Sequence, residues 1–140
     1  MEKKTKTAIT VEATILVLVE KVWELWTTPH HIMKWNNASP DWHTPRAEND
    51  LRVGGRFGSH MAAKDGSMGF DFGGTYDEVK INKRIAYTMD DGRKNIITFT
   101  SNGSETKVSE TFDTESENSV ELQRTGWQAI LNNFKKYAEQ

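Results

Sequence analysis

The amino-acid sequence predicts an α+β fold, in which a curved antiparallel sheet of about seven strands packs against two short helices and a long C-terminal helix. Three observations lead to this prediction. Residues 8–16 alternate apolar and polar side chains with the period of a strand, and residues 120–138 follow the period of a helix. Between them, nine of the ten glycines lie from Gly54 to Gly103, where glycines typically mark hairpins and bulges.

A change of period predicts the first strand and the two short helices. The alternation over Ala8–Leu16 gives a strand one buried face and one solvent-facing side. Over Glu20–Thr27 the apolar residues fall instead at i, i+3 and i+4, namely Val22, Leu25 and Trp26, which predicts an amphipathic helix. The Thr-Pro pair that follows is a typical helix start, because it offers an N-cap and then a proline at the first helical position.

The middle of the chain is predicted to be a run of about six antiparallel strands. Alternation resumes at Trp42 and continues to residue 112. Two-residue hairpin turns are predicted at Asp65-Gly66 and Asp91-Gly92, and a further turn at Asn102-Gly103.

The glycine pair Gly54-Gly55 lies within a segment, 52–61, that we predict to be one strand. Glycines can expose backbone N–H groups to a phosphate, but this spacing matches neither GxGxxG nor GxxxxGK[ST], and no long helix follows. We therefore interpret the pair as structural, because two glycines let a strand bulge and bend as a sheet curling round a helix requires. Arg52 and Arg56 would then share the outer face of this strand.

The C-terminal helix is predicted from a start signal and a sustained period. Asn118–Glu121 fits a capping box, and the apolar residues that follow recur with helical spacing. Gly126 lies inside this helix, where glycine costs about 1 kcal/mol relative to alanine. We expect the missing side chain to let the helix lie close against a strand.

Composition excludes several classes of protein. Eighteen basic and twenty acidic residues leave a net charge of −2, which argues against a nucleic-acid binder. The absence of cysteine excludes disulfides, thiolate nucleophiles and Cys-ligated zinc. The longest apolar run, Ile15–Val19, is too short for a membrane span, and the N-terminus lacks the apolar stretch of a signal peptide. We expect a single cytoplasmic domain over residues 1–140, with no membrane span.

The histidines and serines do not form a recognisable catalytic or metal-binding motif. His30, His31, His43 and His60 match neither HxxxH nor HExxH with a carboxylate at ligand spacing. The sequence around Ser59 lacks the GxSxG turn of a hydrolase. We therefore expect no metal site, no cofactor and no catalytic residue of these kinds.

Three short stretches occur in an order and spacing that resemble one superfamily. They are Val22–Pro29 with Trp35, then Asp50–Phe57, then Gly126-Trp127 followed by Ile130-Leu131 and Tyr137. Together they resemble the START-like or SRPBCC superfamily, and within it the branch related to the C-terminal domain of the heat-shock protein 90 ATPase activator. The resemblance covers residues 8–138 and implies the helix-grip fold.

Function is less closely implied, because this fold hosts binding proteins, enzymes and chaperone partners. The eukaryotic activators for which the branch is named carry an additional N-terminal domain that helps to engage the chaperone. Seven residues precede the first predicted strand here, and nothing in them matches that domain.

Glu110 is the most informative polar residue. Thr106, Val108 and Phe112 are predicted to face inward, so strand alternation turns Glu110 inward too. A buried carboxylate either finds a partner or stays protonated with a raised pKa. One interpretation is a cavity anchor for a ligand hydroxyl or amine, or a general acid or base. The other, which we favour at this point, is a structural ion pair, for instance with Arg124, or a position near an open rim.

Five tryptophans are a high count for a chain of 140 residues. Trp26 and Trp127 are interpreted as core, because aromatic side chains bury large areas. Trp35 and Trp42 flank the polar segment Asn36–Asp41 at the expected mouth of a cavity. There they could also gate the cavity or stack on a ligand.

These features predict that the domain binds a small, largely apolar molecule in a cleft between the C-terminal helix and the sheet. We expect the wall to comprise Phe57, Phe70, Phe72, Tyr76, Tyr87, Phe99, Val108, Glu110, Trp127, Ile130 and Phe134. Two alternatives stay open. One is a protein-interaction module that stimulates a chaperone ATPase. The other is a cyclase- or hydrolase-type enzyme that uses Glu110, Tyr76, Tyr87 or His60.

Overall fold

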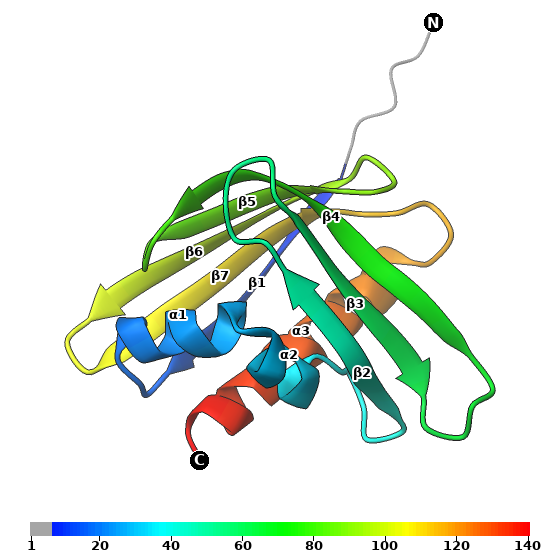
Figure 1. The fold of residues 1–140 in the computed structure, drawn as a ribbon, viewed down its shortest axis with the longest axis horizontal. Helices are drawn as coiled ribbons and strands as arrows, with labels where there is room; N and C mark the ends of the chain where they lie inside the picture. The colour runs from blue at the N-terminus through cyan, green and yellow to red at the C-terminus, as the bar shows by residue number, and fades with distance from the viewer. Residues whose placement is uncertain (1–6) are drawn as a thin grey trace, which may run out of the picture.

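Seven strands form one antiparallel sheet in the order β1-β7-β6-β5-β4-β3-β2 (Figure 1). The computed structural model describes residues 7–140. The strands are β1 (Ala8–Ile15), β2 (Trp42–Asn49), β3 (Arg56–Ala63), β4 (Gly69–Lys80), β5 (Arg84–Met89), β6 (Lys94–Asn102) and β7 (Glu105–Asp113). Consecutive strands from β2 to β7 are hairpin neighbours, and the first strand joins the sheet beside the last.

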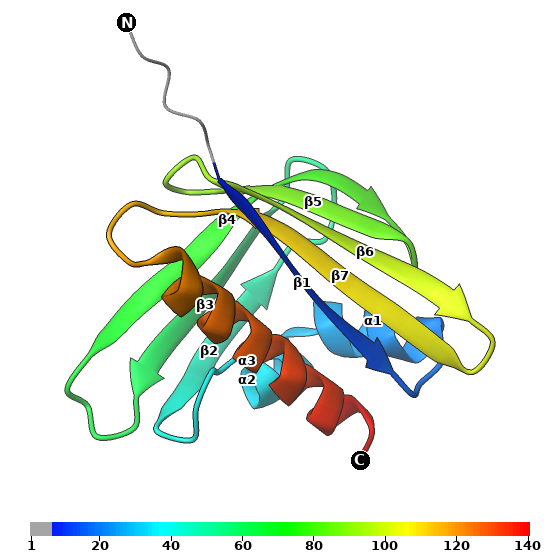
Figure 2. The ribbon, with the colours of Figure 1, turned by 180° about the vertical axis from the view of Figure 1, so that it is seen from behind.

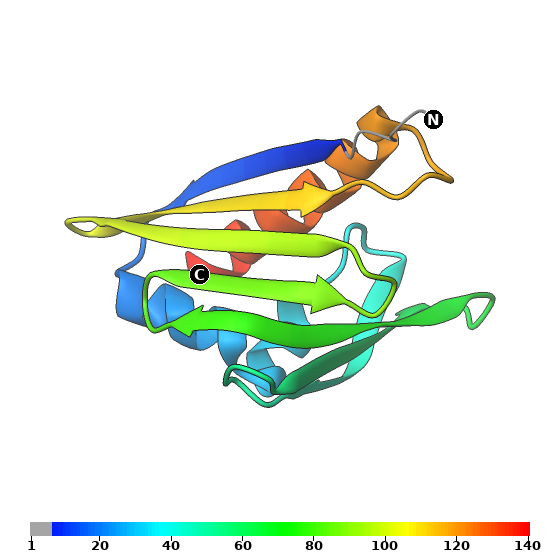
Figure 3. The same ribbon diagram turned by 90° about the horizontal axis from the view of Figure 1, so that it is seen from above.

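The three helices are α1 (Val19–Thr27), α2 (Pro29–Trp35) and α3 (Val120–Ala138), and all lie on the same side of the sheet (Figures 2 and 3). The long helix α3 runs diagonally across that side, and α1 and α2 lie beside its C-terminal end (Figure 2). This arrangement confirms the predicted fold class, the two short helices after the first strand and the long terminal helix. Among residues 7–140 no helix is long and apolar enough to cross a membrane.

The start of α3 lies one residue later than the predicted capping box. Ser119 is the N-cap, and its side chain accepts a hydrogen bond from the backbone N–H of Leu122. Lys135 and Lys136 lie in the last turn, where positive charge interacts favourably with the helix dipole.

The predicted strand over 52–61 is wrong in its first half. Residues 50–55 form the turn between β2 and β3, and the strand begins at Arg56. Gly54 has a φ of +83°, which favours glycine, and its N–H donates to the carbonyl of Tyr76 at 2.9 Å. A Cβ on Gly55 would lie 2.1 Å from the carbonyl oxygen of Asp50. The glycine pair therefore closes a turn rather than bending a strand.

The two arginines beside this turn consequently have separate roles. Arg52 pairs with Asp50 inside the turn, at 2.9 Å from Nε to Oδ2. Arg56 reaches from β3 to Asp90, at 3.0 Å from Nη2 to Oδ2. Both pairs are exposed to solvent, so each contributes little to stability.

The solid part of the core lies between α1, α2, the C-terminal half of α3 and the strands β1, β6 and β7. Leu131 and Phe134 of α3 are fully buried there. Phe134 packs against Trp26 and Trp35, with ring centroids 4.8 and 4.9 Å away. This packing anchors one half of α3, and the N-terminal half spans the cavity described next.

Candidate functional site

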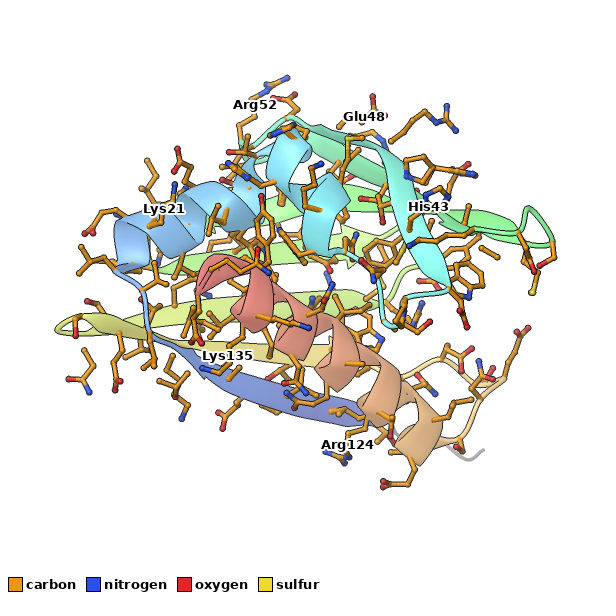
Figure 4. The ribbon with its side chains drawn as sticks, turned by 90° about the horizontal axis from the view of Figure 1, so that it is seen from below. Lys21, His43, Glu48, Arg52, Arg124 and Lys135 are labelled. Carbon is orange, nitrogen blue, oxygen red and sulfur yellow. The ribbon has the colours of Figure 1, made fainter. Side chains whose placement is uncertain are left out.

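A cavity of about 320 Å³ lies between the sheet and the N-terminal half of α3. Figure 4 shows α3 passing in front of the sheet, with Arg124 on the outer side of the helix and Glu48 and His43 on β2. The volume is at the lower end of the range typical of small-molecule sites. Most of the wall is aromatic or aliphatic, and it includes Trp26, Ile32, Trp35, Phe57, Met61, Phe70, Phe72, Tyr76, Ile85, Tyr87, Ile97, Trp127 and Ile130.

The structure brings most of the predicted wall residues together around this cavity. These are Phe57, Phe70, Phe72, Tyr76, Tyr87, Glu110, Trp127 and Ile130. The other three, Phe99, Val108 and Phe134, belong to the solid core instead. Phe99, for example, makes edge contacts with Trp23 and Trp26. Strand alternation identified the correct face for most of the strand residues, although Phe70 is 50% exposed, and the helical period did so for the three residues of α3. Neither pattern could tell which positions along a face meet the cavity and which meet another side chain.

Several lining residues are absent from the predicted wall. The polar ones are Asn36, Glu48, Ser59, Arg93, Glu115, Asn118 and Gln123, and the apolar ones are Trp26, Ile32, Trp35, Met61, Ile85 and Ile97. Gln123 could have been found, because it precedes Trp127 and Ile130 by one and two helical turns on the same face. Arg93 and Glu115 lie outside regular strands, so no periodic pattern indicates where their side chains go.

The four tryptophans considered above divide differently from the expectation. Trp26, Trp35 and Trp127 all line the cavity as well as packing against other rings. Trp35 is buried, and its Nε1 donates to the carbonyl of Leu25 at 2.9 Å, so it forms fixed wall. Trp42 lies outside the cavity lining and contacts Phe70, with ring centroids 5.9 Å apart.

Glu110 is buried in the cavity wall and forms a small polar cluster with two neighbours. Nδ2 of Asn95 donates to Oε2 of Glu110 at 3.1 Å and to the hydroxyl oxygen of Tyr87 at 2.8 Å. Burial raises the pKa of Glu110 to about 7, and the hydrogen bond from Asn95 opposes this rise. Burial also raises the pKa of Tyr87, and the nearby charge of Glu110 adds to the effect.

The ion-pair interpretation of Glu110 is wrong. Arg124 pairs with Glu121 on the exposed side of α3, at 3.9 Å from Nε to Oε1. Within residues 7–140, no Lys, Arg or His lies within 4.0 Å of the Glu110 carboxylate. Glu110 is only 5% exposed, so it does not lie at an open rim either.

Asn95 leaves one polar atom unmatched beside this carboxyl. The side chain is fully buried, and its Oδ1 has no hydrogen-bond partner among the described residues. A buried acceptor without a donor is unfavourable. The cluster of Glu110, Asn95 and Tyr87 therefore contains at least one acceptor oxygen to which no described residue donates a hydrogen bond.

His60 does not join the tyrosines and Glu110. Its Nδ1 lies 2.7 Å from Oδ1 of Asp71, in a separate polar hollow of about 680 Å³ that Arg46, Arg56 and Asp90 also line. Of the four residues named as enzyme candidates, Glu110, Tyr76 and Tyr87 line the same cavity, and His60 lies outside it. Within the described part of the chain, no three His, Asp or Glu side chains could hold a metal ion.

Gly126 does not have the role expected of it. A Cβ on this residue would meet no other atom within 4 Å, so the helix is not held close to a strand at this point. Gly126 lies one turn after Gln123 and one turn before Ile130, both of which line the cavity. The missing side chain leaves open space beside the cavity wall.

Comparison with known proteins relates the chain to one family. Residues 17–139 match the sequence model described as Activator of Hsp90 ATPase homolog 1-like protein. No curated protein sequence matches the chain.

Solved structures agree with this match. The solution structure of an AHSA1-like protein from Aeromonas hydrophila is 50% identical, with a TM-score of 0.89 over 95% of this chain and 92% of that one. A protein from Cytophaga hutchinsonii is 60% identical, with a TM-score of 0.82 over 94% of this chain and 91% of that one. A protein from Chromobacterium violaceum, 23% identical, shares the fold with a TM-score of 0.85 over 95% of this chain and 97% of that one.

Proposed function

The chain belongs to the Activator of Hsp90 ATPase homolog 1-like family, and on that premise we propose that it binds a small, largely apolar molecule in the cavity between α3 and the sheet. The observation that carries the proposal is the composition of the wall. Aromatic and aliphatic side chains make up most of it, with a buried polar cluster at Glu110. An apolar wall favours binding by about 25 cal/mol for each Å² of ligand surface removed from water, and a few polar groups fix the orientation.

Contacts between the aromatic side chains support a cavity that exists before a ligand arrives. Phe57 packs against Tyr87 and Tyr76, with ring centroids 4.5 and 5.2 Å apart. Trp127 stacks on Phe112 of β7 at 3.9 Å, with an interplanar angle of 11°. Since these rings support one another, little side-chain freedom is lost when a ligand binds.

The proposal is tested by filling the cavity. Ile130→Phe adds a ring to the wall, so we expect naphthylmethanol to bind the variant at least about tenfold more weakly than wild type, measured by calorimetry. Val120→Phe is the matched control, because Val120 lies at the exposed start of the same helix and outside the cavity. Equal affinity in both variants would overturn the proposal, as would failure of wild type to bind the alcohol, the corresponding amine and the corresponding acid alike. Native mass spectrometry of gently purified protein would show whether a molecule is retained.

A second candidate function is stimulation of a chaperone ATPase. Exposed apolar side chains between β1 and α1 favour it, because Leu16 and Leu18 are 64% and 55% exposed. We expect Leu16→Ser with Leu18→Ser to reduce any increase in ATP turnover that the wild-type protein causes in a bacterial chaperone. The naphthylmethanol affinity should stay unchanged in the same variant, which separates the two functions.

A further inference from the structure

We propose that the preferred occupant of the cavity is an apolar amine, bound as its ammonium ion between Glu110 and the aromatic wall. This inference rests on the proposed ligand-binding function and specifies the chemical class of the ligand. Three independent features carry it: the unpaired carboxyl, the balance of charge around the cavity, and the arrangement of the rings.

The first feature is the lack of a cation at Glu110. The carboxyl is buried, it accepts one hydrogen bond from Asn95, and no described cation pairs with it. Its other oxygen, Oε1, accepts no hydrogen bond from the described residues, and Glu110 lines the cavity. An ionised carboxylate in such a place is unfavourable unless a positive charge joins it. An ammonium group in the cavity would supply both the charge and the missing donors.

The second feature is the charge of the cavity lining as a whole. Three carboxylate side chains, Glu48, Glu110 and Glu115, line the cavity, together with one guanidinium, Arg93. Arg93 is already bound, with Nε at 2.7 Å from Oδ2 of Asp91. The lining therefore favours a positive ligand and disfavours an anionic one.

The third feature is a set of aromatic rings in the same cavity wall as the carboxyl. The rings of Phe72, Tyr87 and Trp127 lie near one another, with centroids 6.4 Å apart for Phe72 and Tyr87 and 6.2 Å for Phe72 and Trp127. Tyr87 also shares its Asn95 partner with Glu110. Aromatic faces attract a cation that has lost its water, so the rings and the carboxylate would bind the same ammonium group.

The charged and polar groups around Glu110 determine how this binding depends on pH. The strands contribute Tyr87 and Asn95 to these groups. Helix α3 contributes Gln123 and Trp127, which carry no charge. Arg93, Glu48 and Glu115 complete the set. Because the pKa of Glu110 is raised to about 7, the carboxylate forms as the pH rises from 6 to 8. Amine affinity should rise with it by about tenfold, whereas a neutral ligand gains nothing from this ionisation.

The test compares three probes that share one ring system: naphthylmethylamine, naphthylmethanol and naphthoic acid. Calorimetry at pH 8 and low salt should show the amine binding wild type at least about tenfold more tightly than the alcohol, and the acid more weakly than the alcohol. Glu110→Gln should remove the preference for the amine and leave the affinity for the alcohol within about threefold. Glu121→Gln is the matched control, because it removes the same charge from an exposed site on α3.

Each other outcome decides between the two proposals. Equal affinity for amine and alcohol in wild type, or a preference that survives in Glu110→Gln, would overturn the amine inference and leave the cavity function standing. Failure of all three probes to bind wild type would overturn both. If Glu110→Gln does not fold, the pH series on wild type decides, and an amine affinity that does not change between pH 6 and 8 overturns the inference.

Discussion

Nδ2 of Asn95 lies 3.1 Å from Oε2 of Glu110 and donates the one hydrogen bond that this buried carboxyl receives from the described residues. Asn95 is a neutral donor, and no described cation pairs with Glu110. A single neutral donor stabilises a carboxylate less than a cation does. The relationship explains why burial dominates the pKa of Glu110 and raises it to about 7.

The first prediction concerns stability against pH. The pKa of Glu110 is about 7 in the folded protein and near 4.5 in the unfolded chain, so the folded state holds the proton more tightly. This contribution to stability is fully present below pH 4.5 and is lost as the pH rises to about 7. The free energy of unfolding of wild type should therefore fall by about 3 kcal/mol relative to Glu110→Gln between pH 4 and pH 8.

Urea unfolding of both proteins at several pH values measures this difference. Glu121→Gln is a suitable control, because Glu121 is exposed on α3 and its substitution should leave the pH profile of wild type unchanged. A constant difference between wild type and Glu110→Gln across this range would show that the carboxyl is not destabilised by burial.

The second prediction concerns the glycine in α3. Gly126→Ala should stabilise the protein by about 0.5–1 kcal/mol, because alanine favours a helix and the new Cβ meets no atom within 4 Å. Gly74→Ala is the contrasting variant, since its Cβ would lie 2.4 Å from the carbonyl oxygen of Thr88 in β5. It should destabilise by more than about 1 kcal/mol. Thermal unfolding of both variants measures the two effects. A loss of stability in Gly126→Ala would show that a Cβ at this position does not fit without contact.

The third prediction separates the core from the cavity wall. Phe134 is fully buried between Trp26 and Trp35, so Phe134→Leu should cost about 1–2 kcal/mol of stability and change naphthylmethanol affinity less than about twofold. Phe72 is partly buried and faces the cavity, so Phe72→Leu should cost less stability and weaken binding several-fold. Urea unfolding and calorimetry on both variants give the two readouts. The reverse pattern would mean that the cavity is not where the probe binds.

Sequence periodicity could predict the face of a residue but not its depth. The alternation along β7 placed both Val108 and Glu110 inward, and both are buried. Yet only Glu110 meets the cavity, because α3 packs solidly through its C-terminal half and not over its N-terminal half. That difference depends on the shapes of side chains from several elements, which a single strand pattern does not contain.

The sequence pattern also gave a wrong prediction where the same residues are compatible with two backbone conformations. Glycines at 54 and 55 fit a bulged strand as well as a turn. The positive φ of Gly54 and the hydrogen bond from the N–H of Gly55 to the carbonyl of Arg52 decide for the turn. The cluster of Glu110, Asn95 and Tyr87 arises from three strands. The hairpin signals indicated that β3 pairs with β4, β5 with β6 and β6 with β7. They indicated neither the place of β1 beside β7 nor the register that puts Asn95 beside both partners.

The fourth prediction tests the role of Asn95 directly. Asn95→Leu keeps a buried side chain of similar size but removes the donor to Glu110 and the unpartnered Oδ1. Since that hydrogen bond lowers the pKa of Glu110, its loss should raise the titration midpoint above 7, followed by NMR of the side-chain carboxyl carbon. The variant should also lose stability relative to wild type as the pH rises, because ionised Glu110 then has no donor. Asn102→Leu is the control, as Asn102 is exposed at the end of β6 and contacts Glu105. A midpoint that stays the same or falls would show that Asn95 does not stabilise the carboxylate of Glu110. Another group would then have to donate a hydrogen bond to it.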